Sequence, residues 1–266
     1  MITVKGKYHT THVGDIKFPA GEIGVRVEAG FQEAVKIHAH LKTNDDIMKL
    51  LFTVDALRRE NPEVKISLYM PYIPYARQDR VCNRGESLSI AVFAKLINSC
   101  EFESVTVVDP HSDVSPALIE RCKVVDQVEV FRNIQSYWGA TVIVAPDAGA
   151  YKKCHKFASA VGAKGVLVCH KIRDLKTGRI EKVFTSDEIN AGGHYLVLDD
   201  ICDAGATFLQ LVQMFPTTVR LDLAVTHGIF TKGIDQLAKV YDKIHTTTSY
   251  HGEVPFTHDQ LFWREL

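Results

Sequence analysis

The sequence predicts an α/β fold built on parallel sheets, and two observations support this class. Short apolar runs alternate with helical patterns along the 266 residues, and strand followed by helix is the repeat of the α/β class. Several runs are nearly continuous in Val, Ile and Leu, which is typical of parallel strands covered on both faces. The two halves share this pattern, so we expect two related domains, over residues 1–125 and 126–266.

Six segments have the length and apolar character of such strands: residues 64–70, 104–109, 141–145, 165–170, 195–198 and 221–226. Four segments have helical patterns: residues 45–60, 87–99, 151–161 and 207–214. The first helix is the clearest, because Leu50, Val54 and Leu57 recur at helical spacing. Asn44 or Asp45 is expected to cap its start.

Composition excludes several classes of protein. Formal net charge is −1, so no global basic field favours nucleic acid or an anionic membrane. No apolar run approaches the roughly 20 residues that a spanning helix needs, and the first twenty residues contain no signal-peptide pattern. The six cysteines form no C-x-x-C pair, which argues against a zinc site and favours a reduced, cytoplasmic protein.

The first polar motif follows the predicted strand at 195–198. Two acids stand at the strand end, where carboxylates can accept hydrogen bonds from adjacent sugar hydroxyls. Small residues then lead into a helix, so backbone N–H groups and the helix amino end can approach a phosphate. The expected ribose-phosphate site consists of Asp199, Asp200, Asp203, Ala204, Gly205, Ala206 and Thr207. The structural alternative is an ordinary β–α turn with an Asp cap.

A second polar motif lies behind Pro71 and Pro74, between a strand and a helix. A guanidinium offers planar stacking and forked donors to a nucleotide, whereas a surface salt-bridge loop is the alternative. The residues concerned are Arg77, Gln78, Asp79 and Arg80. Both motifs fall at the carboxyl ends of predicted strands, where ligands bind in open α/β sheets.

These motifs carry a resemblance to known families. Residues 198–207 resemble the phosphoribosyl-diphosphate (PRPP) loop of the type I phosphoribosyltransferase fold. Residues 46–59, followed by 71–80, resemble a block of the ribose-phosphate pyrophosphokinase family that phosphoribosyltransferases do not carry. The resemblance implies two tandem type I phosphoribosyltransferase-like domains, each a mostly parallel sheet flanked by helices. The first would bind ATP, and the second would carry the ribose 5-phosphate loop and a catalytic loop.

The resemblance also implies roles for individual residues. Residues 17–22 are similar to a family segment that reaches ATP in a neighbouring subunit, although Ala20 replaces the family's Asp or Asn. The implied ATP contacts are Phe18, Ala20, Gly21, Glu22, Arg77, Gln78, Asp79 and Arg80.

Two further pairs of residues match functional positions of the family. His111 and Asp147 are implied to serve the Mg²⁺–nucleotide complex, although Mg²⁺ prefers oxygen ligands and the chemistry of His111 alone favours a loop residue. Lys171 and Arg173 are implied to be catalytic, at the opening of a polar loop over 174–181. Two cations on a closing loop can neutralise charge as a diphosphoryl group moves.

The resemblance therefore implies a ribose-phosphate diphosphokinase that makes PRPP and AMP from Mg-ATP and ribose 5-phosphate. A phosphoribosyltransferase that consumes PRPP and a non-catalytic regulatory subunit are the alternatives. We expect ATP and ribose 5-phosphate as ligands and neither nucleic acid nor membrane as partner. The resemblance also implies a homo-oligomer, from dimer to hexamer, with the ATP site shared between subunits.

Overall fold

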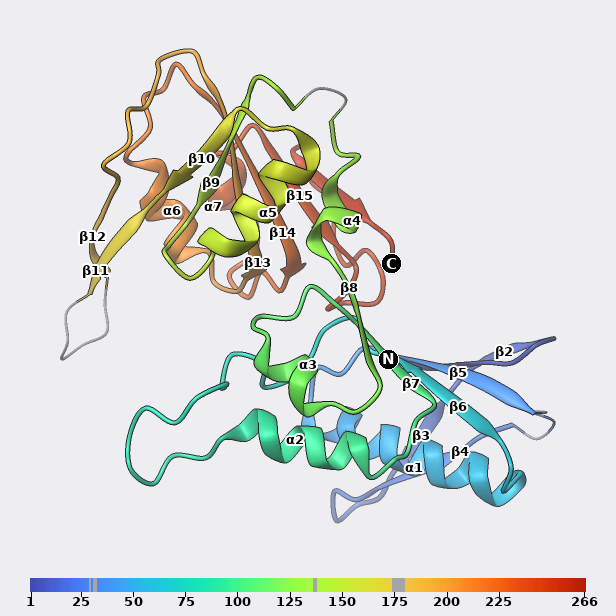
Figure 1. Ribbon diagram of the computed structural model, residues 1–266. Helices are drawn as coiled ribbons and strands as arrows, with labels where there is room; N and C mark the ends of the chain where they lie inside the picture. Colours follow the sequence, from blue (N-terminus) through green and yellow to red (C-terminus); the bar gives the residue numbers. More distant parts are fainter. Residues whose placement is uncertain (29, 31–32, 136–137, 174–179) are drawn as a thin grey trace. The chain divides into compact units, whose positions relative to one another are not determined.

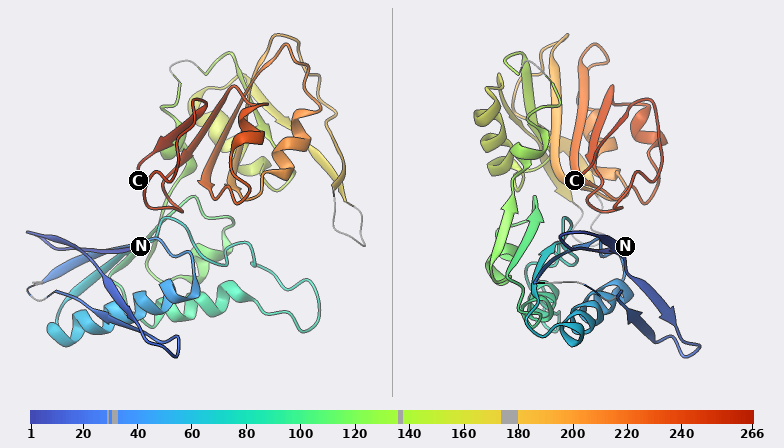
Figure 2. Two further views of the ribbon diagram at one scale, coloured as in Figure 1. Left: turned by 180° about the vertical axis from the view of Figure 1, so that it is seen from behind. Right: turned by 90° about the vertical axis from the view of Figure 1, so that its right-hand side faces the viewer.

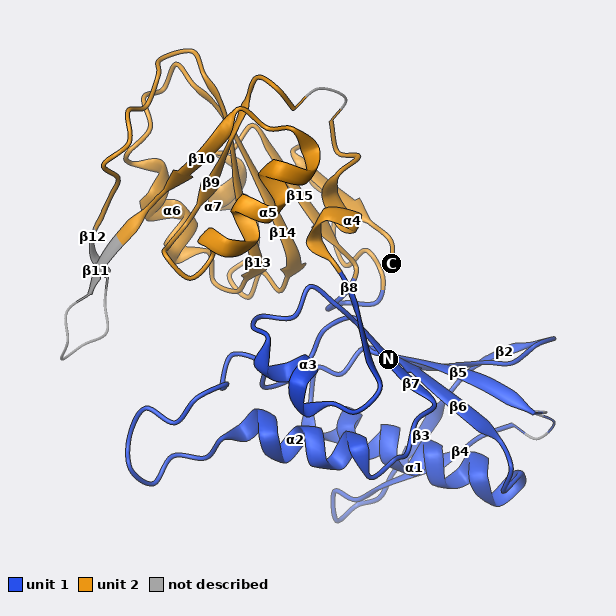
Figure 3. Cartoon of the chain, viewed as in Figure 1, with its two compact units in different colours: residues 1–125, 249–252 blue, residues 126–248, 253–266 orange. Residues whose placement is uncertain are grey.

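The structure, a computed structural model, describes residues 1–28, 30, 33–135, 138–173 and 180–266, with only the backbone of residues 171–173 and 180–182 (Figure 1). It divides into two compact units (Figure 3). Unit 1 comprises residues 1–125 and 249–252, and unit 2 comprises residues 126–248 and 253–266. The sequence pattern places residues 249–252 in the second domain, whereas they pack with the first unit.

Unit 1 is built on a six-stranded sheet in the order β2-β1-β5-β6-β7-β8. β1 is antiparallel to both its neighbours, and β5 through β8 are parallel. The strands are β1 (Ile2–Lys5), β2 (Thr10–His12), β5 (Ala34–Ala39), β6 (Lys65–Tyr69), β7 (Ser104–Val108) and β8 (Cys122–Val125). A separate hairpin joins β3 (Gly14–Lys17) to β4 (Ile23–Arg26).

The helices of unit 1 are α1 (Asn44–Glu60), α2 (Ser89–Asn98) and α3 (Val114–Leu118). α1 and α2 lie against one face of the sheet (Figure 2), and their apolar side chains form one core with that face. Leu50 and Phe93 of the helices and Leu68 of β6 are fully buried in this core. The opposite face of the sheet carries polar side chains such as Lys36 and His38.

The start of α1 differs from the prediction. Its N-cap is Thr43, and neither Asn44 nor Asp45 fills that position. The Thr43 hydroxyl accepts from the Asp46 N–H at 3.1 Å, and the Asp46 carboxylate accepts from the Thr43 N–H at 2.9 Å. This reciprocal capping box satisfies two backbone donors at once, which a cap one residue later would not achieve.

Unit 2 is built on a sheet whose six strands are all parallel, in the order β10-β9-β13-β14-β15-β16. The strands are β9 (Thr141–Ala145), β10 (Gly165–Val168), β13 (His194–Cys202), β14 (Arg220–Gly228), β15 (Lys243–Thr247) and β16 (Leu261–Arg264). A hairpin of β11 (His170–Arg173) and β12 (Ile180–Phe184) extends from the sheet.

The helices of unit 2 are α4 (Gln127–Phe131), α5 (Tyr151–Val161), α6 (Ala206–Val212) and α7 (Asp235–Ala238). α6 and α7 cover one face of the sheet, where Leu211 and Leu237 pack in one core with Leu223 of β14. α5 lies on the opposite side (Figure 2). The described part of the chain contains no helix with the length and apolar character of a membrane span.

The predicted α/β class is confirmed, and all six predicted strands are present. β13 and β14 are longer than predicted because they continue past the apolar runs, through Asp199 and Asp200 to Cys202 and through His227 to Gly228. The amino-terminal strands β1–β5 and the strands β8, β11, β12, β15 and β16 were not among the predictions. Their residues alternate between polar and apolar or are very few, so they lack the continuous apolar runs used to find the others.

Candidate active site

At the carboxyl edge of the unit 2 sheet, two neighbouring strands end in acids. β13 passes Asp199 and Asp200 before the loop to α6, and β9 is followed by Pro146 and Asp147. Asp200 is 5% exposed, whereas Asp199 is half-buried. The Asp199 carboxylate also accepts from the Asp200 N–H at 2.9 Å. The predicted pair of acids therefore lies within the strand end, next to the Asp147 that was predicted to serve Mg²⁺.

The charge on this pair is costly. The pKa of Asp199 is raised well above its usual value, first because burial removes its carboxyl group from water and next because Asp200 lies beside it. Asp147 adds a further repulsion. A ligand that donates hydrogen bonds or brings positive charge would relieve this repulsion, so the site favours hydroxyl groups or a cation.

The loop after β13 has the geometry of an anion site. Gly205 adopts φ +78° and ψ −1°, in the left-handed region, and stands at the N-cap of α6. Leu237 lies 3.3 Å from the point where a Cβ on Gly205 would sit, so only glycine fits without displacement. α6 begins at Ala206, one residue earlier than predicted, and the loop residues Ala204 and Ala206 are exposed.

Thr231 is a neighbour of this loop that the sequence did not reveal. Its hydroxyl donates to the Asp203 carboxylate at 2.8 Å, and its N–H donates to the Asp203 carbonyl at 3.1 Å. Thr231 follows β14, the next strand of the sheet, so adjacency of strand ends is the signal that could have found it.

At the carboxyl edge of the unit 1 sheet, the Arg-rich motif follows β6. Tyr75 begins it with a positive φ of 62°, and its ring packs 5.9 Å from the Phe93 ring of α2. The Gln78 N–H donates to the Tyr75 carbonyl at 2.9 Å, which closes a turn. Arg77 and Gln78 are exposed, so an anchored turn presents both side chains to solvent.

Asp79 links this motif to the end of the neighbouring strand β7. Its side chain is only 6% exposed and accepts from Arg80 Nε at 3.1 Å. Burial works to raise the Asp79 pKa, but a hydrogen bond from Ser112, the Arg80 guanidinium and the nearby His111 together lower it. The structure thus brings the Arg-rich motif and His111 together, as expected for strands β6 and β7 that lie side by side.

The Phe18 segment forms the turn of the β3–β4 hairpin. The Phe18 N–H donates to the Glu22 carbonyl at 2.8 Å, and the Gly21 N–H donates to the Phe18 carbonyl at 2.9 Å. Phe18 is 49% exposed, which suits a stacking surface. The hairpin packs on α1, where Lys49 pairs with Asp15 at 2.6 Å.

The side chains of Lys171 and Arg173 lie outside the described residues, as does the segment 174–179 of the predicted catalytic loop. Their backbone forms β11, with a bulge between Ile172 and Arg173.

The two residues predicted to serve Mg²⁺ belong to different units. His111 belongs to unit 1 and Asp147 to unit 2. Among the described residues, no group of three His, Cys, Asp or Glu side chains could hold a metal ion. Mg²⁺ is commonly held by one or two carboxylates together with substrate phosphates. Asp147, beside the repelling acids of β13, fits that role; an imidazole is a poorer match for this hard cation.

Comparison with known proteins agrees with the geometry. Residues 3–100 match the model of the N-terminal domain of ribose phosphate pyrophosphokinase. The chain is 28% identical over 255 residues to the ribose-phosphate pyrophosphokinase of Pyrococcus furiosus, covering 92% of this chain and 88% of that protein. It is also 28% identical over 237 residues to the ribose-phosphate pyrophosphokinase of Mycobacterium bovis, covering 84% of this chain and 71% of that protein.

The fold is also that of a solved structure. The crystal structure of phosphoribosylpyrophosphate synthetase from Mycobacterium smegmatis superposes with a TM-score of 0.82 at 22% sequence identity, covering 96% of this chain and 86% of that one. This match confirms the predicted architecture of two α/β domains with mostly parallel sheets. The matches in sequence and in fold support the predicted resemblance to the ribose-phosphate pyrophosphokinase, or PRPP synthetase, family.

Proposed function

We propose that this chain is a ribose-phosphate diphosphokinase. It would transfer the β,γ-diphosphoryl group of ATP to the anomeric hydroxyl of ribose 5-phosphate, giving PRPP and AMP. The observation that carries the proposal is the acid-and-glycine loop over 199–207, whose half-buried Asp199, buried Asp200 and left-handed Gly205 suit a phosphorylated sugar. The relatives' names support the diphosphokinase reaction.

Substrate binding would divide between two sets of residues. The backbone of Asp203–Thr207, where Ala204 and Ala206 are exposed, would hold the 5-phosphate. Asp199 and Asp200 would accept hydrogen bonds from ribose hydroxyls. Arg77 and Gln78 would contact ATP from their anchored turn. Phe18 and Glu22 would contact ATP from the hairpin of a neighbouring subunit, as the family resemblance implies.

The chemistry would be in-line substitution at the β-phosphorus. The ribose oxygen forms a bond to that phosphorus, the bond from it to the oxygen bridging to the α-phosphate breaks, and the hydroxyl proton is released. No covalent protein intermediate is needed, so catalysis would rest on positioning and charge neutralisation. Lys171 and Arg173 would offset the charge of the moving group.

Mg²⁺ would neutralise the phosphate oxygens of ATP when bound, and Asp147 would be the carboxylate that holds it. The buried carboxyl pair beside Asp147 supports a cation here, because positive charge would lower the pKa that repulsion raises for Asp199. The thiols of Cys100, Cys154, Cys169 and Cys202 are buried, where a cysteine packs as a small hydrophobic residue.

A direct assay tests the proposal. Purified protein is incubated with Mg-ATP and ribose 5-phosphate, and both AMP and PRPP are quantified. The two products should form in equal amounts. Release of AMP that depends on ribose 5-phosphate is the expected result. In a parallel assay without ATP, conversion of PRPP and an added nucleobase to a nucleoside monophosphate and pyrophosphate would instead identify a phosphoribosyltransferase. Absence of turnover, with binding to an active synthetase of the same family, would identify a regulatory subunit.

A further inference from the structure

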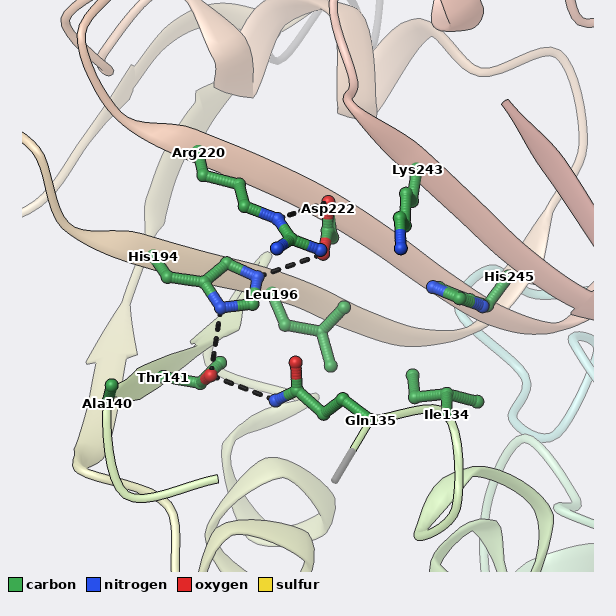
Figure 4. A pocket seen from close by; sticks show the side chains of 10 residues that line it. All are labelled: Ile134, Gln135, Ala140, Thr141, His194, Leu196, Arg220, Asp222, Lys243 and His245. Carbon is green, nitrogen blue, oxygen red and sulfur yellow. Dashed lines mark hydrogen bonds and ion pairs between the residues drawn. The ribbon is translucent and has the colours of Figure 1, made fainter. Parts of the chain in front are cut away.

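A cavity lies at the edge of the unit 2 sheet opposite the candidate active site. Its volume is about 430 Å³, and it is formed where β9, β13, β14 and β15 begin (Figure 4). The ribose-phosphate loop lies at the other end of β13, after Cys202. The cavity is therefore a separate place on the same sheet, and none of the roles proposed above uses its residues.

A continuous hydrogen-bonded row runs along the floor of the cavity. Gln135 Nε2 donates to Thr141 Oγ1 at 2.9 Å, and that hydroxyl lies 3.0 Å from His194 Nδ1. His194 Nε2 lies 2.9 Å from Asp222 Oδ2. The row joins side chains from three neighbouring strands and a loop, all pointing to one face of the sheet (Figure 4). Its members hold one another in fixed positions.

A row of polar side chains is unusual within a parallel sheet. Parallel strands covered on both faces are normally apolar, yet Asp222, the third residue of β14, is only 3% exposed. Arg220 Nη2 donates to the same carboxylate oxygen at 2.9 Å. Burial works to raise the Asp222 pKa, but His194 and Arg220 outweigh it and lower that pKa, so the group is ionised at neutral pH. Stability alone does not call for a buried ion pair here.

The cavity carries an excess of positive charge. Arg220 is paired with Asp222, whereas Lys243 adds a second cation and lies with its ammonium 5.5 Å from the centre of the Phe262 ring. His245 lines the cavity and stacks on the same ring. Burial and the cations Lys243 and Arg220, opposed by Asp222, lower the His245 pKa to about 4. At neutral pH the net charge of these groups favours an anion.

We propose that this cavity binds a phosphate group, carried free or on a sugar-sized ester. Lys243 and the outward side of Arg220 would contact the phosphate, because a guanidinium and an ammonium are the preferred phosphate partners in proteins. Thr141, Gln135 and His194 would face the polar remainder of an ester. The volume lies within the range of small-molecule sites, about 300–1,000 Å³, and exceeds what a bare phosphate fills.

Calorimetric titration of the full chain tests this site without relying on turnover. The probes are inorganic phosphate, ribose 5-phosphate and, as a carboxylate control, citrate. We expect two ribose 5-phosphate sites per chain. Lys243→Glu should abolish one of them, and Lys243→Gln should weaken that one by about tenfold. Lys239→Gln, another exposed lysine of unit 2 outside the cavity, should change neither.

The arms of the titration separate the sources of the phosphate. If inorganic phosphate binds as tightly as ribose 5-phosphate, and Lys243→Glu abolishes that binding, the site is assigned to free phosphate. If ribose 5-phosphate binds more tightly than inorganic phosphate, the site is assigned to a phosphate ester. The proposal would be overturned if each chain bound a single ribose 5-phosphate, and if Lys243→Glu left that binding unchanged while Asp199→Asn removed it. Citrate bound at the Lys243 site more tightly than either phosphate probe would overturn it as well. Because Lys243 is exposed, its variants test binding without disturbing the core.

Discussion

At the carboxyl edge of unit 1, Arg77 and Gln78 extend into solvent from a turn, whereas at the same edge of unit 2 Asp200 is 5% exposed and Asp199 bears a raised pKa. Both edges belong to sheets with neighbouring parallel strands, and both place their polar residues where those strands end. They differ in where the polar groups reside. Unit 1 carries them on an exposed loop, and unit 2 carries them within a buried strand end.

This difference has an energetic consequence. An exposed Arg keeps its hydration in the free protein, so removing it should alter ligand binding with little effect on stability. A buried acid pair is repulsive before a ligand arrives, so removing one acid should increase stability and weaken ligand binding. Loss of a binding group should therefore leave stability unchanged at the unit 1 edge and raise it at the unit 2 edge.

The largest effect is expected from Lys171→Ala. Loss of a cation that stabilises only the moving diphosphoryl group should lower kcat by about 10²–10³-fold, the range seen when one transition-state donor is removed. Ribose 5-phosphate affinity should remain nearly unchanged, because the 199–207 loop is intact. Steady-state kinetics and calorimetry measure the two quantities. Unchanged turnover would remove Lys171 from the proposed mechanism.

Asp199→Asn should show the trade-off of unit 2. Ribose 5-phosphate affinity should fall by about 10–100-fold, as for loss of a charged hydrogen-bond partner. The variant should also melt at a higher temperature than the parent, because a carboxyl whose pKa is higher in the folded state than in the unfolded chain destabilises the fold as pH rises. Each kcal/mol corresponds to about 2–4 °C in a chain of this size.

The difference in melting temperature between Asp199→Asn and its parent should depend on pH. Below the unfolded Asp pKa of about 4, Asp199 is protonated in both states, so parent and variant should melt alike. Above it, the advantage of Asp199→Asn should grow until the folded pKa is passed. Asp259→Asn, an exposed acid of the same unit, is the control and should show no such growth. A variant that is less stable than its parent at pH 7 would contradict the buried repulsion.

Sequence patterns could reveal the existence of both edges but not this difference between them. Continuous apolar runs found the central parallel strands, and the motifs at their ends followed from adjacency. The burial of Asp199 and Asp200 depends on β13 continuing to Cys202, beyond the apolar run that marks it. Thr231, which binds Asp203, is 28 residues away in the chain, and no local pattern connects them.

The cavity residues were missed for a related reason. His194, Arg220 and Lys243 stand singly at the starts of three strands and are 49 residues apart from first to last. Each resembles an ordinary charged residue flanking a strand. Only the parallel register, which aligns His194 with Arg220 and Lys243 with Asp222, gathers them.

Arg77→Ala tests the exposed edge. The KM for ATP should rise by about tenfold, the loss expected from a hydrogen bond to a charged group, and the melting temperature should stay within error because Arg77 is exposed. Arg59→Ala is the matched control, since Arg59 is exposed and pairs only with Asp55 along α1 among the described ion pairs. A clear loss of stability in Arg77→Ala would show that Arg77 also stabilises the fold, so that binding and stability are linked in unit 1 as well.

The smallest effect is expected at glycines, where two positions form a matched pair. Gly205 and Gly21 both have positive φ, 78° and 94°, but only Gly205 has a neighbour, Leu237, within contact distance of an added Cβ. Gly21→Ala should therefore lose about 1–2 kcal/mol from backbone strain alone. Gly205→Ala should lose slightly more, because Leu237 must shift, and should also weaken ribose 5-phosphate binding a few-fold. Chemical denaturation and calorimetry measure both. Equal stability losses with unchanged ribose 5-phosphate affinity would mean that the 203–207 backbone tolerates displacement, and the left-handed Gly205 would then not be needed for ribose 5-phosphate binding.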